Sequence, residues 1–428
     1  MNPAAAAGVP AVAYLNSQYP SLSHTFIERE VRALRAAGVR VRTFTIRAAD
    51  HAGRLGGAHA EAAGETTVIL SGVGPIARDV LAALVRSPIG VLRVIRESQR
   101  LAPPGLRSRV RHLAYAAEGL RLAAELRRAS LTHVHVHMAN NGAAAALLAC
   151  AYDPRLSYSL TIHGSAEFFH VDTWSLAPKA ERAVFVRCIS NFCRAQVMAW
   201  TRPEAWPRFH VVPCGIDPDA FAPREGAPVG PIRLLGVGRF APIKGYAVLL
   251  DACAELSRRG VDWTLGLVGD GPLRGELEHR ARDLGIAGRV TFHGAVAAEA
   301  IADYYRSAEV IVVSSFMEST PVVLMEGMAC GLAVASTRVG GVPDLVADGV
   351  HGVLVAPGSA AALAEGLAGL ASRRDRLAEM GRAGREAVRR MHNIRDVGAA
   401  MTGLFGQFLP GVVAAGEPRS TASAEARA

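Results

Sequence analysis

The chain has 428 residues, of which 50% are hydrophobic, and it carries a formal net charge of +9. This length and apolar content are sufficient for two domains with large cores. No run of about 18 uncharged apolar residues occurs, so the sequence predicts no membrane-spanning helix. The six cysteines form no Cys-x-x-Cys pair, and the first residues lack the basic segment of a secretion signal, so we expect free thiols and a cytoplasmic setting.

The positive charge is concentrated in the first half of the chain. Residues 1–222 contain 25 Lys and Arg against 16 Asp and Glu, whereas residues 223–428 contain 22 of each. Arginine supplies 45 of the 47 basic residues, so Lys179 and Lys244 are the only lysines. An anionic partner is therefore expected to contact the first half.

The beginning of the chain has the pattern of a βαβ unit. Residues 11–15 form an apolar run and residues 39–46 alternate between apolar and polar side chains, and both patterns predict strands. Between them, apolar residues recur at helical spacing from Ile27 to Leu34, and Gly38 ends the predicted helix. Strands that alternate with helices predict a parallel, doubly wound sheet.

The next two segments differ in composition. Residues 48–66 are rich in Ala and Gly and are predicted to form a loop, and residues 76–128 are predicted to be helical, with 11 Arg and four acidic residues. Two interpretations of the arginines stay open: a solvated helical face, or a monotopic surface that meets anionic lipid headgroups. Few aromatic residues accompany the arginines, so a nucleic-acid partner is not expected.

Further strands complete two predicted sheets. In the first half these strands are 132–137, 158–162, 183–189 and 210–212. In the second half they are 232–237, 264–268, 290–293, 310–313, 333–335 and 353–355, with predicted helices between them. The sequence therefore predicts an α/β protein with two doubly wound sheets.

The domain boundaries follow from composition. Residues 223–231 are rich in Pro and Gly and predict a linker between a domain at 1–222 and a domain at 223–395. A closing helix at 396–410 is expected to join the first domain. Residues 411–428 lack apolar periodicity and are predicted to be a disordered tail.

One stretch in the second half carries most of the chemistry. A strand at 310–313 breaks at two serines, and a helix is predicted to begin near Pro321, with Glu318 before it and Glu326 seven intervening residues later. Free amides from Thr320 onward would attract an anion, and two carboxylates suit hydroxyl groups. A nucleotide sugar offers both groups. The alternative is that both glutamates are solvated surface residues.

A second loop, Gly236 to Gly245, follows the first strand of the second sheet and contains Arg239 and Lys244. Ligands bind outside the carboxyl ends of such strands, so the two cations are placed to meet a diphosphate. The loop lacks the order of a Walker motif. The alternative is a pair of ordinary surface cations.

Three more strand ends are candidate parts of a site. Gly269-Asp270-Gly271-Pro272 is compatible with ligand contact and equally with a plain turn, and Phe292-His293-Gly294 is placed to face a base. His163 ends a strand of the first half and can bind a sugar hydroxyl or phosphate, although such a histidine is more often structural. The alternating histidines at 133, 135 and 137 suggest a metal, but no Cys or carboxylate cluster accompanies them, so no metal is expected.

Together these motifs resemble a known family. Gly238-Arg239 with Lys244-Gly245, then Gly269 to Pro272, then Glu318 and Glu326, are similar to the retaining glycosyltransferases of family 4, which have the GT-B fold. The resemblance covers most of the chain.

Within that family, the segment Tyr19 to Glu30 is similar to transferases of the exopolysaccharide and colanic-acid type, as are His135-Val136-His137 and Ile189-Ser190. The subgroup usually has an acidic residue where His24 stands and an aromatic one where Met138 stands. The resemblance places Ser21 and His24 on the acceptor side.

The resemblance also implies a role for each motif. Arg239 and Lys244 would bind the donor diphosphate and stabilise it as it leaves, Glu318 would bind hydroxyls of the donor sugar, and Glu326 would hold the ribose. His163 would line the cleft from the other domain. The implied catalytic set is His163, Glu318, Arg239 and Lys244. The implied donor-binding set is Gly238, Arg239, Lys244, Asp270, Gly294, Glu318, Ser319, Thr320, Pro321, Val322 and Glu326.

The implied reaction moves a sugar from a UDP- or GDP-linked donor to a polysaccharide or polyprenyl-linked glycan and retains the anomeric configuration. It uses no cofactor and no metal. The basic first half adds the expectation of peripheral contact with an anionic membrane at its inner face. Two alternatives stay open: a nucleotide-sugar epimerase, and a non-catalytic protein that binds nucleotide sugars.

Overall fold

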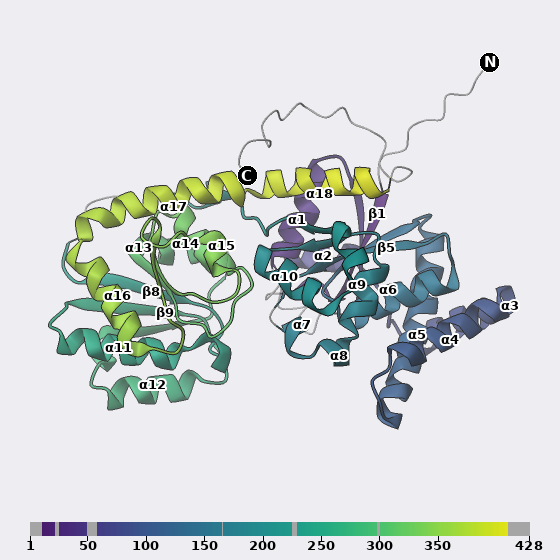
Figure 1. Ribbon diagram of the computed structural model, residues 1–428, viewed down its shortest axis with the longest axis horizontal. Helices are drawn as coiled ribbons and strands as arrows, with labels where there is room; N and C mark the ends of the chain where they lie inside the picture. Colours follow the sequence, from purple (N-terminus) through teal and green to yellow (C-terminus); the bar gives the residue numbers. More distant parts are fainter. Residues whose placement is uncertain are drawn as a thin grey trace, which may run out of the picture.

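The computed structural model describes residues 11–21, 25–48, 58–164, 166–224, 229–297 and 300–409. Two lobes of parallel sheet and helix lie side by side (Figure 1). This arrangement confirms the predicted α/β class with two doubly wound, Rossmann-like domains. The predicted tail lies outside the described residues.

The first lobe is built on a seven-stranded parallel sheet with the strand order β3-β2-β1-β4-β5-β6-β7. Its strands are β1 (Ala11–Gln18), β2 (Arg40–Arg47), β3 (Thr67–Val68), β4 (His133–His137), β5 (Ser157–Ile162), β6 (Val186–Cys188) and β7 (Phe209–Val211). The six strands predicted in this half are confirmed. The two-residue edge strand β3 was not predicted, because a strand this short has no periodicity.

The helices of the first lobe include three long ones that were predicted as one helical region. They are α1 (Thr25–Ala36), α2 (Ala58–Glu65), α3 (Val73–Arg86), α4 (Pro88–Leu101), α5 (Leu106–Arg128), α6 (Asn141–Tyr152), α7 (Ala166–Phe169), α8 (Val171–Trp174), α9 (Leu176–Arg182) and α10 (Asn191–Trp200). The loop predicted at 48–66 is wrong at α2. Alanine has the highest helix propensity, so this Ala-rich segment forms a helix without apolar periodicity.

A ladder of histidine and hydroxyl side chains runs through the core of the first sheet. The histidines of β4 alternate with valines and lie opposite Ser157, Ser159 and Thr161 of β5. His135 Nδ1 lies 2.7 Å from Ser159 Oγ and its Nε2 lies 2.8 Å from Thr161 Oγ1. His133 likewise has a hydroxyl at each ring nitrogen. Hydroxyl partners thus account for both ring nitrogens of His133 and of His135. The sequence analysis associated no carboxylate with these histidines, but the fold brings buried Glu30 beside His135 and His137, with ligand atoms within 4.8 Å of one another, a set that could hold a metal ion. The expectation that the protein uses no metal therefore stays a prediction.

The second lobe is a six-stranded parallel sheet with the order β10-β9-β8-β11-β12-β13. Its strands are β8 (Ile232–Val237), β9 (Trp263–Val268), β10 (Val290–Gly294), β11 (Val310–Val313), β12 (Ala333–Thr337) and β13 (Gly352–Val355). Its helices are α11 (Tyr246–Arg258), α12 (Arg274–Asp283), α13 (Ile301–Ser307), α14 (Val322–Ala329), α15 (Val342–Leu345), α16 (Ala360–Ser372) and α17 (Leu377–Met391). All six predicted strands are confirmed. The strand order reverses between β8 and β11, and ligands of such sheets bind outside the carboxyl ends at that point.

The two lobes are connected twice. After α17 the chain crosses back, and Ile216 exchanges backbone hydrogen bonds with His392 and Ile394, at 2.9 and 2.8 Å. The closing helix α18 (Ile394–Phe408) then packs on α1, and Met401 and Phe405 are fully buried in the core of the first lobe. Helices α17 and α18 run along the top of both lobes (Figure 1). The exact domain boundaries at 222 and 395 stay predictions.

Burial of Glu118 on α5 makes stability depend on pH. This side chain is 4% exposed, and its Oε2 has no hydrogen-bond partner among the described residues. Loss of hydration raises its pKa to about 7. Because the pKa is higher in the folded than in the unfolded chain, the stability that the neutral carboxyl contributes is complete below about pH 4.5 and is lost as the pH rises through 7.

The variant Glu118→Gln is therefore expected to be more stable than the wild type at pH 8, by about 2–3 kcal/mol, and no more stable at pH 4.5. Urea unfolding at both pH values measures the difference. The control is Glu276→Gln, which changes an exposed glutamate of α12 that forms no ion pair with a described residue. A Glu118→Gln effect that is the same at both pH values would contradict the raised pKa.

Candidate active site

Three loops are joined at the carboxyl edge of the second sheet. The amide of Gly238 donates to Val268 O at 2.9 Å, and the amide of Gly269 donates to Gly294 O at 2.8 Å. Gly269 has φ 136°, and a Cβ atom there would overlap the carbonyl of Gly238. Glycine is therefore required for the close approach. The ends of β8, β9 and β10 form one surface, with the predicted donor residues Gly238, Asp270 and Gly294 on it.

Asp270 and Arg239 differ in whether their charged groups are already engaged by the protein. The carboxylate of Asp270 accepts from the amide of Gly271 at 2.7 Å and lies 3.5 Å from Arg274, so it mainly shapes its own turn. Arg239 is exposed and forms no ion pair with any described residue. Its guanidinium is available to an anion outside the strand ends.

Lys244 and Glu318 form the central ion pair of the site. Lys244 Nζ lies 2.6 Å from Glu318 Oε1, and the hydroxyl of Ser315 donates to the same oxygen at 2.7 Å. Gly245 adopts φ 63°, and a Cβ there would overlap the carbonyl of Ser314. This glycine brings the Lys244 loop against the Glu318 loop. Glu318 Oε2 has no partner among the described residues and remains available to a hydroxyl.

The predicted helix after Glu318 is confirmed as α14. Pro321 is its N-cap and Val322 its first residue, so the amides of the first turn have no acceptor within the helix. Ser319 and Thr320 are buried just before it, at 7% and 8% exposure. The positive end of α14 thus lies beside the Lys244–Glu318 pair. An anion placed there would meet the helix amides and Lys244 together.

Glu326 is held from both lobes. Its Oε1 accepts from Arg29 of α1 at 2.9 Å, and its Oε2 accepts from the hydroxyl of Tyr305 at 2.9 Å. Both carboxylate oxygens of Glu326 therefore already accept a hydrogen bond from the protein, and its predicted role in holding ribose stays a prediction. Sequence reasoning missed Arg29 and Tyr305 as partners, because 297 and 21 positions separate them from Glu326 and nothing local marks the contact.

His163 approaches the site from the first lobe. Its Nε2 lies 2.9 Å from His137 Nδ1, and its ring packs on Phe26 with ring centroids 4.6 Å apart. The next residue, Gly164, is in contact with Ser319, since a Cβ at Gly164 would overlap the Ser319 hydroxyl. The structure thus brings the predicted His163 and Ser319 together across the two lobes.

A buried carboxylate fixes the His163 loop, and a buried lysine fixes the neighbouring loop at Ala139 and Asn140. Glu167 accepts from the amides of His163, Gly164 and Ala139, at 2.8, 2.9 and 2.5 Å. Lys179 Nζ donates to the carbonyls of Ala139, Asn140 and Trp174, at 2.8, 2.9 and 2.5 Å. Burial raises the pKa of Glu167 to about 7 and lowers the pKa of Lys179 to about 7.

Sequence reasoning did not find either residue of this pair. The available signal was a glutamate in the first turn of a helix after a strand end, where a carboxylate accepts from free amides.

Other contacts between the lobes surround the site. Asp344 Oδ2 accepts from the amide of Asn191 at 2.7 Å, at the start of α10. Thr320 Oγ1 donates to Ile189 O at 3.4 Å. Of the two predicted acceptor-side residues, Ser21 is half-buried at the carboxyl end of β1, and His24 lies outside the described residues.

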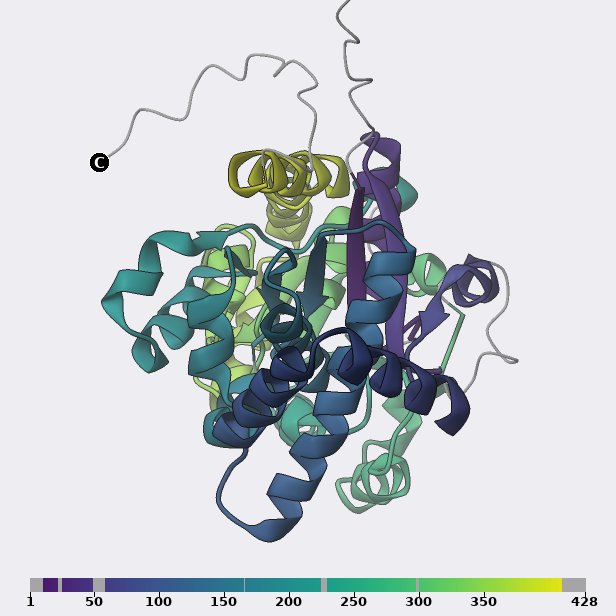
Figure 2. The same cartoon turned by 90° about the vertical axis from the view of Figure 1, so that its right-hand side faces the viewer.

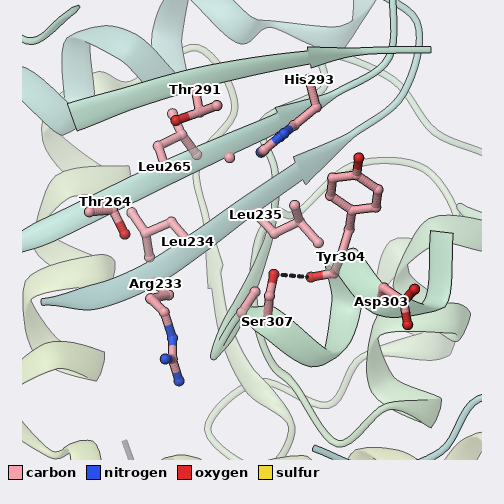
Figure 3. A pocket seen from close by; sticks show the side chains of 12 residues that line it. Arg233, Leu234, Leu235, Thr264, Leu265, Thr291, His293, Asp303, Tyr304 and Ser307 are labelled. Carbon is pink, nitrogen blue, oxygen red and sulfur yellow. Dashed lines mark hydrogen bonds between the residues drawn. The ribbon is translucent and has the colours of Figure 1, made fainter. Parts of the chain in front are cut away.

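A separate pocket of about 380 Å³ lies on the face of the second sheet beside α13 (Figure 3). Leu235 and Gly266 form part of its floor, and the rings of His293 and Tyr304 meet at its wall with centroids 4.9 Å apart. A Cβ on Gly266 would lie 3.2 Å from His293 Nε2, so this ring points back along the sheet. The segment predicted to face a base therefore offers Gly294 and not the His293 side chain.

Two Rossmann-like domains whose carboxyl edges contribute charged residues to one place have the architecture of the GT-B fold. The structure is similar to sucrose-phosphate synthase of Thermosynechococcus elongatus, with a TM-score of 0.72 and 20% identity over 94% of this chain and 100% of that one. It is also similar to Alr3699/HepE of Anabaena, with a TM-score of 0.69 and 17% identity over 93% of this chain and 100% of that one. These likenesses show the fold.

The sequence comparisons identify the family. Residues 218–387 match the family described as glycosyl transferases group 1. The 2-deoxystreptamine glucosyltransferase of Streptomyces kanamyceticus is 31% identical over 325 residues, which cover 64% of this chain and 80% of that protein. The chain belongs to the glycosyl transferases group 1 family.

Other relatives match a shorter part. A D-inositol 3-phosphate glycosyltransferase of Nocardiopsis dassonvillei is 42% identical over 34% of this chain and 38% of that protein. A GDP-mannose-dependent alpha-(1-6)-phosphatidylinositol monomannoside mannosyltransferase of Mycolicibacterium smegmatis is 31% identical over 50% of this chain and 62% of that protein. The chain thus spans less than two thirds of the length of these two relatives.

Proposed function

We propose that this protein transfers a sugar from a nucleoside-diphosphate donor to a polysaccharide or lipid-linked glycan, with retention of configuration. The observation that carries the proposal is the Lys244–Glu318 ion pair beside the positive end of α14, with the guanidinium of Arg239 exposed at the same sheet edge. The cations Lys244 and Arg239 could bind a diphosphate, and the carboxylate of Glu318 could bind sugar hydroxyls. A nucleotide sugar carries both kinds of group.

The proposed mechanism is leaving-group stabilisation. As the bond from the anomeric carbon to the diphosphate breaks, negative charge grows on the departing phosphate, and Lys244, Arg239 and the amides of α14 would bind it. The acceptor hydroxyl would bond to the anomeric carbon on the same face, and an oxygen of the departing phosphate would take the hydroxyl proton. Glu318 would hold the sugar so that the acceptor approaches the anomeric carbon, which is a contribution from positioning. His163, fixed by Glu167, would contact the sugar from the first lobe. These groups supply the positive charge, so we propose that no metal takes part.

Donor and acceptor are proposed as classes. One relative is named for GDP-mannose, and others are named for inositol 3-phosphate and 2-deoxystreptamine. We propose a donor sugar that is linked to UDP or to GDP. The segment Tyr19 to Glu30 supports the exopolysaccharide type, whose acceptors are lipid-linked, and we propose that the protein works as a peripheral protein at an anionic membrane surface.

The first test is a thermal-shift screen of the purified chain against UDP, GDP, CDP, ADP and their sugars, with and without Mg²⁺. A ligand at about 100 times its Kd stabilises the fold by about 2.7 kcal/mol. We expect a shift with one nucleotide that is independent of Mg²⁺ and is lost in Lys244→Ala. The control is Arg282→Ala, an exposed arginine of α12 that forms no ion pair with a described residue.

Two outcomes would change the assignment. No shift with any nucleotide would overturn the donor site. A shift with turnover of the donor alone into a different nucleotide sugar would identify an epimerase, and binding without turnover in the presence of lipid-linked acceptors would identify a non-catalytic binder.

A further inference from the structure

The helices α3, α4 and α5 carry most of the exposed apolar surface of the described residues. Among the residues that the structure describes, sixteen large hydrophobic side chains are exposed, and ten of them lie on these three helices. They include Val85 at 86% exposure, Leu106 at 80% and Leu92 at 66%. Scattered single apolar residues are ordinary on protein surfaces, whereas a concentration of this kind marks an interaction site.

On α4, the exposed apolar residues are distinct from the apolar residues that pack into the core. Val91 and Val94 are buried against the core, at 8% and 0% exposure, whereas Ile89, Leu92 and Ile95 are exposed at 66%, 66% and 41%. The helix is therefore apolar toward the core and again toward the outside. An ordinary surface helix has a polar outer face.

The acidic residues of these helices do not face the outside. Asp79 is buried and paired with Arg121 and Arg128. Glu97 is paired with Arg100 and Arg182, at 2.6 Å each. Glu118 is buried, and Glu125 is paired with Arg121 and Arg128. No carboxylate is left to neutralise the outer face.

The arginines of the outer face are unpaired in consequence. Arg86, Arg93, Arg96, Arg107 and Arg109 are exposed, and none forms an ion pair with a described residue. They stand beside the exposed apolar residues on the same three helices. The face therefore combines apolar side chains with uncompensated positive charge.

The three helices lie at one end of the molecule. They project from the first lobe on the side away from the second lobe (Figure 1), and a view from that side shows α3 and α4 in front (Figure 2). A partner bound to them would leave the edges that form the candidate active site uncovered. No helix in the described part of the chain has the length and apolar character to cross a bilayer.

We propose that the outer face of α3, α4 and α5 binds the surface of an anionic lipid bilayer. Apolar side chains would enter the boundary between headgroups and acyl chains, and arginines would contact the anionic headgroups. This inference deepens the proposed function, on which its biological meaning rests, because it names the surface that would hold the enzyme beside a lipid-linked acceptor.

Charge favours a bilayer over the other occupants of such a face. A second copy of the chain would bring arginines against arginines, which repel. Nucleic acid would meet the cations but has no use for exposed aliphatic side chains, and the large hydrophobic residues exposed on these helices are all aliphatic. Anionic lipid complements both components.

The test is flotation of the full chain with vesicles of phosphatidylcholine alone and of phosphatidylcholine with phosphatidylglycerol. We expect retention by the anionic vesicles, weakened by salt. Replacing Val85 and Leu92 by Asp is expected to weaken binding on the order of tenfold or more, because it removes inserted apolar surface and adds charge that anionic lipid repels. Arg93→Glu with Arg96→Glu should do the same through charge alone.

Matched controls separate the face from general effects. Val229→Asp with Val350→Asp changes two valines exposed by 82% and 53% at the other lobe, and it should leave retention unchanged. All variants should keep the wild-type melting temperature. Equal retention of the wild type and of Val85→Asp/Leu92→Asp overturns the proposal, as does dimerisation through this face without vesicle binding.

Failure of this inference is distinguishable from failure of the proposed function. If Val85→Asp/Leu92→Asp loses vesicle binding but keeps the nucleotide-dependent thermal shift, the face binds membrane and the donor site is separate. If the wild type binds vesicles, Val85→Asp/Leu92→Asp does not, and no nucleotide shifts the wild type, the membrane face stands and the proposed function falls. If no anionic vesicle retains the wild type, the face does not bind membrane, whatever the nucleotide result.

Discussion

Replacing Lys244 by Ala is expected to reduce turnover on the order of 10²-fold or more, with a smaller change in the apparent affinity for donor. Lys244 Nζ lies 2.6 Å from Glu318 Oε1, and an ammonium has three protons to donate. One bond to Glu318 leaves others for the diphosphate. Because negative charge grows on the departing phosphate, its attraction to Lys244 is stronger in the transition state than in the ground state.

The fold should survive this substitution. The side chain of Lys244 is 30% exposed, and such a part-exposed ion pair contributes about 0–1 kcal/mol to stability. Ser315 still donates to Glu318 in the variant. A loss of activity without a fall in melting temperature would therefore report on chemistry. The control Arg282→Ala removes a cation from the same domain and should keep full activity.

The pattern of kinetic constants decides the interpretation. A fall in kcat with little change in KM indicates an interaction made in the transition state, whereas a rise in KM alone indicates uniform binding of donor. Full activity of Lys244→Ala would contradict the assignment of the leaving-group site to this edge of the sheet.

Replacing Arg187 by Met is expected to destabilise the fold by about 3–5 kcal/mol. Arg187 is fully buried and forms an ion pair with Glu30, which is 2% exposed. It also donates to the carbonyls of Val212 and Pro213, at 2.9 and 2.7 Å. Its removal leaves the Glu30 carboxylate charged and buried, and it frees two carbonyl groups.

A double-mutant cycle tests the cause. Glu30→Gln removes the charge and keeps an acceptor for the hydroxyl of Tyr14, which donates to Glu30 Oε1 at 2.9 Å. Arg187→Met in that background should cost several kcal/mol less than in the wild type. Denaturant unfolding measures each corner. Arg258→Met, which breaks an exposed pair with Glu255, should cost less than about 1 kcal/mol.

Equal costs of Arg187→Met in both backgrounds would show that packing, and not the buried charge, dominates. Arg187 also holds the segment that leads into a connection between the lobes. Val212 and Pro213 lead directly into the segment at Ile216 that pairs with the chain crossing back from the second lobe. The buried pair thus anchors one of the two connections between the lobes.

The architecture was predictable because its signals are local. Short strand-like segments and the turns between them are properties of neighbouring residues, and the twelve strands predicted in this way are confirmed. The errors are local as well. The helix α2 and the two-residue strand β3 fall in a segment with no apolar pattern.

The candidate site was predictable in part for the same reason. The spacing of Glu318 and Glu326 on either side of a helix start, and the glycines that carry Arg239 and Lys244, are visible in short stretches of sequence. That parallel strands share one carboxyl edge is a rule of the fold. Together these features place the donor-side residues close to one another before any coordinates are known.

Which groups surround those residues became visible in the folded chain. Arg29 reaches Glu326 from 297 positions away, and Glu167 fixes the His163 loop through backbone amides. Such contacts depend on how the lobes pack, and one-letter patterns do not record this.

The arginines at 76–128 show the same division. Composition and periodicity predicted a basic, helical region, and they left a solvated face and a membrane surface open as interpretations. The structure showed that the carboxylates are buried or paired while aliphatic side chains remain exposed beside unpaired arginines. Secondary structure and motif follow from near neighbours in the chain, whereas burial and charge pairing are settled by residues that are distant in sequence, and for that reason they required the fold.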